Sequence, residues 1–262
     1  MKMKRNSLLA AVMVMSGSAN AMLQPGDLAF TAFNADEDGF ALVALRDLSP
    51  YTTVYFSDNE WNGGPPGVGS FNTGENTFAW VSGTESIAAG SVVRFQAIDK
   101  ATRSASNGAF GLIASGSSGF SASGDTLFAY SGDAGGTPTA FVAALSSENF
   151  AGSDLAGTEL IPGVNSVAIK TSTDFGEYTG TRSGLSSIGA YAGLINDATL
   201  WTTRTTGDFS TQAPNLTQFA VAPVPEPQTY ALLLTGLGLV GMRISQRQRT
   251  RLPILLTGPS MR

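Results

Sequence analysis

The feature that most restricts how this chain can fold is a succession of short segments that alternate between apolar and polar side chains and end in Gly, Pro, Asn, Asp or Ser. A period of two residues is typical of β-strands with one buried face, and frequent turn residues are typical of sandwiches and barrels. The expected strands are residues 27–33, 40–46, 52–57, 77–82, 91–98, 125–130, 140–145, 166–170 and 216–221. The sequence therefore predicts an all-β protein built as a single β-sandwich.

One stretch departs from this pattern and predicts a short helix. Its apolar residues recur at intervals of three and four, the spacing of one helix face. They are Leu185, Ile188, Tyr191, Leu194 and Ile195, and the helix is expected to end near Asp197. Two further segments, 26–45 and 124–145, resemble each other, and each is expected to form a hairpin. They are either related halves or apolar strands that are alike by chance.

Two residue types are missing, and their absence excludes whole classes of site. The chain of 262 residues has no cysteine and no histidine. Disulfides, thiolate nucleophiles, Cys/His zinc sites and Ser-His-Asp triads are therefore excluded. The phosphate-binding motif Gly-x-x-x-x-Gly-Lys does not occur either. We expect a protein that is not an enzyme.

Residues 1–21 have the three parts of a secretory signal peptide: a positive start, a short apolar run and small residues before the cleavage position. These parts are Lys2, Lys4 and Arg5, then residues 8–15, then Ala19 and Ala21, with cleavage expected before Met22. The alternative is a membrane anchor, but eight apolar residues at about 1.5 Å each cannot cross about 30 Å of hydrocarbon. We therefore expect export through the Sec translocon and cleavage by signal peptidase.

Residues 223–251 combine a proline-flanked glutamate, an apolar run and a cluster of arginines, in that order. The run, residues 229–244, is apolar on all sides, which favours a single transmembrane helix over a helix buried in a protein core. Basic residues behind it are typical of a segment that stops translocation. The motif consists of Pro225, Glu226 and Pro227, and the arginines are Arg243, Arg247, Arg249 and Arg251.

This ordered combination resembles the PEP-CTERM sorting signal of Gram-negative bacteria. The resemblance implies that residues 229–244 hold the exported protein in the lipid of the inner membrane, where exosortase, a membrane protease and transpeptidase, recognises it. Pro225, Glu226 and Pro227 would form the recognition motif, and the arginines the retention stop. Members of this family are commonly associated with exopolysaccharide and biofilm, which implies a final place at the cell surface or in the extracellular matrix. Such signals usually lack a tail like residues 252–262.

The body between the two ends, residues 22–222, is strongly acidic. It has seven basic and nineteen acidic residues, a net charge of −12. Phosphate backbones repel such a surface, so we expect no binding of nucleic acid. We expect this charge to serve solubility alone. The alternative is that it also attracts divalent cations loosely.

The best candidate for a metal site is the loop 34–39, where oxygen-bearing side chains alternate before a glycine. Calcium prefers such ligands, and Asn34, Asp36 and Asp38 would supply them. An EF-hand would need a glutamate at the position of Leu45, so that motif is absent. The alternatives are a looser Ca²⁺ site and an acidic hairpin tip, and no other cofactor is expected.

Asp58, Glu60 and Trp61 join two carboxylates to an aromatic ring. In a strand, the two carboxylates would share a face about 7 Å apart, a spacing that permits acid–base hydrolysis of a glycoside, and Trp61 could stack on a sugar. The alternative is structural: Asp58 caps a turn and Trp61 packs at the rim of the sandwich. Trp80 and Trp201 are expected in the core.

The body also resembles secreted bacterial β-sandwich domains of the lamin-tail type, which are broadly immunoglobulin-like. The resemblance is carried by residues 26–30, the loop 34–39, residues 54–61 and residues 74–75. It implies a surface or adhesive module without enzymatic activity. The alternatives are a carbohydrate-binding module and a hydrolase that uses acidic residues.

Overall fold

The computed structural model describes residues 22–116, 119–121, 123–134, 136–223 and 227–249. Several residues with expected roles lie outside these ranges. They are Ala19 and Ala21 of the signal peptide, Pro225 and Glu226, Arg251, and the tail 252–262. The chain divides into two compact units, of which the first ends at Val221 and the second begins at Ala222.

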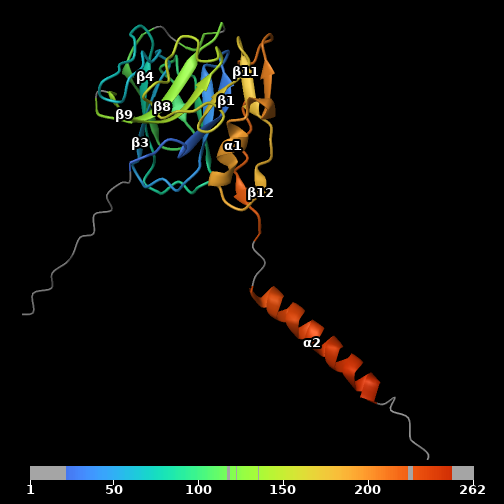
Figure 1. Ribbon diagram of the computed structural model, residues 1–262. Helices are drawn as coiled ribbons and strands as arrows, with labels where there is room; N and C mark the ends of the chain where they lie inside the picture. Colours follow the sequence, from blue (N-terminus) through green and yellow to red (C-terminus); the bar gives the residue numbers. More distant parts are fainter. Residues whose placement is uncertain (1–21, 117–118, 122, 135, 224–226, 250–262) are drawn as a thin grey trace, which may run out of the picture. The chain divides into compact units, whose positions relative to one another are not determined.

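The first unit is built on two six-stranded sheets (Figure 1). The first sheet contains β1 (Leu28–Asn34), β2 (Gly39–Ala44), β5 (Val92–Gln96), β6 (Ser104–Ala105), β11 (Phe175–Tyr178) and β13 (Trp201–Arg204). Their order is β13-β11-β1-β2-β5-β6, and all neighbouring pairs are antiparallel.

The second sheet is also largely antiparallel. It contains β3 (Thr53–Ser57), β4 (Thr77–Val81), β7 (Ala109–Ala114), β8 (Thr126–Gly132), β9 (Pro138–Ser146) and β10 (Ser166–Ala168). Their order is β10-β9-β8-β3-β4-β7, and only the pair β9–β10 is parallel. A small parallel pair is formed by β12 (Ser183–Leu185) and β14 (Ala220–Val221).

Aromatic side chains from both sheets fill the space between them. The ring of Phe40 on β2 lies 4.5 Å from that of Phe95 on β5 and 5.0 Å from that of Phe56 on β3. All three rings are buried in one continuous apolar cluster that also contains Trp80. Pairs at these separations add to the stabilisation from burial alone. The predicted all-β architecture, with an apolar core between two sheets, is therefore confirmed.

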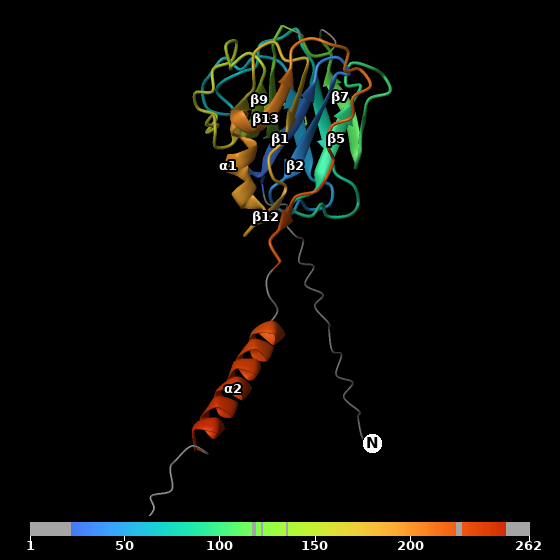
Figure 2. The same cartoon turned by 90° about the vertical axis from the view of Figure 1, so that its right-hand side faces the viewer.

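The outer faces of both sheets are partly covered, so several strands are buried on two sides. Figure 2 shows α1 (Ala192–Ile195) next to β1, and the buried Ile195 joins the main cluster there. On the other sheet, Tyr55 and Tyr130 point away from the main core into a second cluster. The loop between β3 and β4 folds over that outer face and contributes Trp61.

Most of the expected strands are found, with shifted ends, but five others were missed. The segment 216–221 is largely extended chain, and only its last two residues form β14. The missed strands are β6, β7, β11, β12 and β13. The expected helix begins later than its apolar spacing predicts, with a 3₁₀ turn at Gly189–Tyr191 followed by α1. The two expected hairpins are confirmed as β1–β2 and β8–β9, one in each sheet.

The second unit contains the helix α2 (Pro227–Arg249), which includes the whole expected helix 229–244. Among the helices of the described residues, none has a stretch that is both long enough and apolar enough to cross a membrane. The helix is thus confirmed as a helix, whereas its crossing of a membrane stays a prediction.

We expect Phe40→Ala to lower the free energy of unfolding by about 3–5 kcal/mol, because the substitution leaves a cavity between the two sheets. Denaturant unfolding of the full chain, followed by tryptophan fluorescence, measures this loss. Leu112→Ala on β7 is the control, because Leu112 is 36% exposed and its truncation should cost less than about 1 kcal/mol. Equal losses in the two variants would contradict this description of the core.

Candidate functional site

Acidic side chains from several loops meet at one end of the sandwich. The register places Ser57, at the end of β3, opposite Thr77 at the start of β4 and Phe128 near the start of β8. It also places Thr126 opposite Ser146, at the end of β9. The residues that flank these strand ends therefore come together. We call this cluster the acidic end; it consists of Asp38, Asp58, Glu60, Glu75, Asp125 and Glu148.

Direct hydrogen bonds hold the two ends of the β3–β4 loop against each other. Oδ1 of Asp58 accepts a hydrogen bond of 3.0 Å from the backbone N–H of Asn76. Oδ1 of Asn59 accepts one of 3.1 Å from the N–H of Glu75. The N–H of Gly116 donates to Oδ1 of Asn76 at 3.0 Å, which ties the loop after β7 to the same place. Asp58 and Glu75 are therefore neighbours in space, although the loop between them is long.

The strands β8 and β9 bring the remaining carboxylates to this end. The hydroxyl of Thr126 donates to Oε1 of Glu148 at 3.0 Å, and Oδ2 of Asp125 accepts from the N–H of Ser121 at 2.7 Å. Gly152 lies between two of the acids: a Cβ there would be 3.0 Å from Cγ of Glu60 and 3.3 Å from Oε1 of Glu148. A side chain at this position would push these carboxylates apart.

Burial and the repulsion of neighbouring carboxylates raise the pKa values of four acids at this end, namely Asp38, Asp58, Glu75 and Asp125. Burial is the larger cause, and neighbouring carboxylates add to it. The pKa of Asp58 rises to about 7, that of Glu75 to about 7 and that of Asp125 to about 8. Burial also raises the pKa of Asp38 to about 6, against an opposing hydrogen bond from the N–H of Phe120. Among the described residues, no basic group contributes to the shifts of Asp58, Glu75 or Asp125.

This arrangement can take up protons or a cation more readily than it can attack a substrate. Asp58 is 1% exposed, so a substrate could reach its carboxylate only if the loops moved. In the described part of the chain, no three Asp, Glu, His or Cys side chains form a group that could hold a metal ion. A site with fewer carboxylates would need backbone, amide or water oxygens as further ligands.

The structure separates the three residues Asp58, Glu60 and Trp61 that the sequence grouped as a ligand site. β3 ends at Ser57, so Asp58 and Glu60 do not share the face of a strand. Trp61 is 0% exposed and packs edge-on against Phe71 and Phe141, with ring centroids 5.1 and 4.9 Å apart. It has no free face on which a sugar could stack. Trp80 and Trp201 are buried, as expected.

The three candidate ligands of the loop 34–39, Asn34, Asp36 and Asp38, each accept hydrogen bonds from backbone N–H groups. Oδ1 of Asn34 accepts from the N–H groups of Asp36 and Glu37, at 3.1 and 3.0 Å. Oδ2 of Asp36 accepts from the N–H of Phe209 at 2.7 Å. Oδ1 of Asp38 accepts from that of Phe120 at 2.6 Å. These bonds support the interpretation as a hairpin tip that anchors two distant segments, and calcium binding by this loop stays a prediction.

Sequence reasoning missed the roles of Glu75, Asp125 and Glu148. A usable signal was present, because each of these acids lies within two residues of a strand end. In an antiparallel sheet, the end of one strand and the start of its neighbour lie at the same edge. Which strands are neighbours, however, depends on the strand order, and the sequence pattern did not predict that order.

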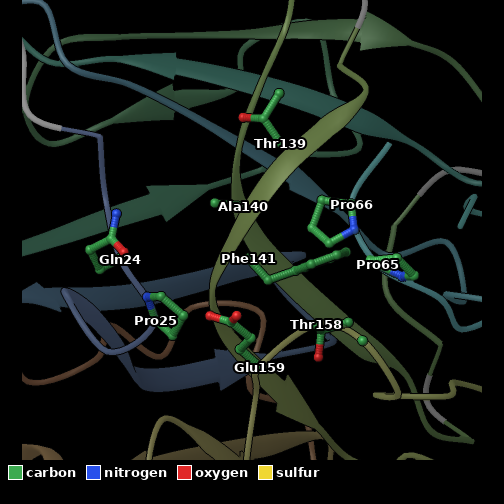
Figure 3. A pocket seen from close by; sticks show the side chains of 10 residues that line it. Gln24, Pro25, Pro65, Pro66, Thr139, Ala140, Phe141, Thr158 and Glu159 are labelled. Atoms are coloured by element: carbon green, nitrogen blue, oxygen red, sulfur yellow. The ribbon is translucent and has the colours of Figure 1, made fainter. Parts of the chain in front are cut away.

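A separate cavity of about 250 Å³ lies beside β9 (Figure 3). Pro25, Pro65 and Pro66 line it together with the hydrogen-bonding side chains of Gln24 and Glu159. Its aromatic residue, Phe141, is 1% exposed. The cavity thus offers polar contacts to a small ligand but no stacking surface.

The second unit presents apolar side chains on every side of α2. Leu232, Leu233 and Leu234 are consecutive, and successive residues of a helix point about 100° apart. The exposed apolar residues are Tyr230, Leu232, Leu233, Leu234, Leu237, Leu239, Val240, Met242 and Ile244. Of the expected sorting residues, Pro227 is the first residue of the helix, and Arg243, Arg247 and Arg249 belong to its last turns.

No family model matches the chain, and neither the curated proteins nor the solved structures yielded a match.

We expect the protein to lose stability as the pH rises from about 4 to about 8. The pKa values of Asp58 and Asp125 are higher in the folded protein than in the unfolded chain, so folding favours the protonated carboxyls and this contribution fades as the pH rises. A shift of the size found for Asp58 corresponds to a fall in Tm of roughly 10 °C between pH 5 and pH 8. Thermal unfolding in a buffer without divalent cations measures it.

The matched variant is Asp125→Asn, which removes one of the raised carboxyls and should flatten this pH dependence. Asp208→Asn is the control, because Asp208 is exposed and lies outside the acidic end. A Tm that stays level or rises between pH 5 and pH 8 in the wild type would contradict the electrostatic description.

Proposed function

We propose that the protein is an exported surface or matrix protein whose C-terminal segment is a sorting signal for exosortase. The proposal rests on one observation: α2 begins at the last proline of the Pro225-Glu226-Pro227 motif and exposes apolar side chains on all sides. A water-soluble surface rarely presents so continuous an apolar area without a partner. Lipid is the partner that fits a helix without a polar face.

The arginines near the end of the helix favour an orientation in which this end stays on the cytoplasmic side. The apolar run from Tyr230 to Met242 has thirteen residues. It would be about 20 Å long, shorter than the roughly 30 Å of a typical hydrocarbon core. A short segment is accommodated by local thinning of the bilayer and by basic side chains that reach the interface, as Arg243 would. Such an anchor suits a transient membrane-held intermediate, from which exosortase later removes the anchor.

The body would then be the part that stays outside the cell. Its net charge of −12 and its two-layer β-architecture support a soluble extracellular module that associates with exopolysaccharide or biofilm matrix. Among the described residues, no observation favours the two alternatives. Carbohydrate binding loses its proposed stacking residue because Trp61 is buried, and hydrolysis loses its proposed carboxylate pair because Asp58 is inaccessible.

We expect Glu226→Gln to block processing at the C-terminus in the source cell while leaving export intact, because the substitution removes the charge of the motif. Membrane fractionation and intact-mass measurement of the exported protein check this. The wild type should be recovered outside the cell with both ends shortened, whereas the variant should accumulate in the inner membrane with residues 223–262 still attached. Glu85→Gln, on an exposed loop of the body, is the matched control and should behave as the wild type.

Recovery of the wild-type chain from the cytosol with both termini uncut would refute the proposal. Normal C-terminal processing of the Glu226→Gln variant would instead refute the assigned motif.

A further inference from the structure

Two carboxylates of the acidic end each have a buried oxygen without a hydrogen-bond partner among the described residues. These atoms are Oδ2 of Asp58 and Oε2 of Glu75. Asp58 is the more deeply buried of the two, with 1% of its surface exposed. Buried polar atoms in folded proteins almost always have a partner, and buried charges are paired or coordinate a metal. The two oxygens therefore point to a ligand that supplies positive charge.

The backbone brings these two carboxylates to the same place. The N–H of Asn76 holds Oδ1 of Asp58, while the N–H of Glu75 holds Oδ1 of Asn59. Because Oδ1 of Asp58 accepts this backbone hydrogen bond, Oδ2 is the oxygen of Asp58 that remains free to bind a ligand. Among the charges that act on Asp58, that of Glu75 is the strongest.

The surroundings strengthen the attraction for a cation. Glu60 and Glu148 act on Glu75, and Asp125 is influenced by both Asp58 and Glu75. None of the described basic residues offsets this negative charge at Asp58, Glu75 or Asp125.

We propose that Asp58 and Glu75 bind a calcium ion, which links the two ends of the β3–β4 loop. Calcium is a hard cation that takes six to eight oxygen ligands in flexible geometry, so two carboxylates can be completed by backbone and amide oxygens and by water. Such additional ligands are required, because no three such side chains in the described ranges form a metal-binding group. Magnesium fits less well, because it demands a near-ideal octahedron and gives up its water reluctantly.

The ion would stabilise the loop that covers the outer face of the second sheet. That loop carries Trp61 and Phe71, which pack against Phe141. An ion that links residues 58 and 75 would fasten both ends of this cover. The site is distinct from the loop 34–39, whose oxygens already accept backbone hydrogen bonds.

The test is calorimetric titration of the full chain, in mild detergent at pH 8.5, with calcium chloride, and thermal unfolding with calcium, magnesium or a chelator. We expect one calcium ion per chain. We also expect a rise in Tm of about 5–10 °C when calcium exceeds its dissociation constant a hundredfold. Asp58→Asn and Glu75→Gln should each weaken binding at least about tenfold, since each removes a charged ligand. Glu85→Gln, an exposed acid away from the site, should bind calcium as the wild type does.

The outcomes separate a specific site from general attraction to an acidic surface. Absence of calcium binding to the wild type, or binding that survives both substitutions, would overturn the proposal, as would an equal rise in Tm with magnesium. Asn at position 58 can still accept the hydrogen bond from Asn76. If Asp58→Asn nevertheless fails to fold, Glu75→Gln decides the question, because Glu75 is only half-buried.

Discussion

The packing of aromatic rings between the two sheets is the interaction on which the rest of the structure depends. Phe40, Phe56 and Phe95 interlock across the interface and set the facing positions of β2, β3 and β5. A shift of one residue in any of these strands would turn its rings out of the core, so the register is strongly determined. The same register determines which strand ends meet. The position of the acidic end thus depends on the aromatic core, although the two share no residues.

The sequence predicted strands that are buried on both faces, such as β1 and β2, as well as strands with one buried face. β4 and β5 are of the second kind, with buried residues at every second position. β7 escaped prediction because Ala109–Ala114 is apolar without alternation and mostly exposed at the edge of its sheet. β11 and β13 are four residues each, too short to display a period. Their pairing with β1 is a long-range choice that local pattern does not encode.

Only part of the candidate site could be predicted from the sequence, again because long-range contacts bring its residues together. Asp58 and Glu60 stood out because they are close in sequence, yet the strongest electrostatic neighbour of Asp58 is Glu75, seventeen residues away. Trp61 attracted a functional interpretation because an aromatic beside two acids is typical of sugar sites. Its burial follows from the loop's return over the outer face of β3 and β8, where Tyr55 and Tyr130 left an apolar surface to cover. Contacts of this kind depend on chain reversals, which composition and spacing do not determine.

The two units of the chain meet opposite physical demands. The first places most of its large aromatic and aliphatic side chains inside and most of its nineteen acids in loops and at strand ends, where all but a few, such as Asp58 and Asp125, are at least partly exposed. α2 does the reverse and exposes nearly every large apolar side chain between Tyr230 and Ile244. Burial of those side chains would release about 25 cal/mol per Å² of apolar surface. Among the described residues of the second unit, these side chains stay exposed, so this free energy is not gained there. A helix that exposes so much apolar surface would gain free energy from an apolar partner, whereas the body already has most of its large apolar side chains inside.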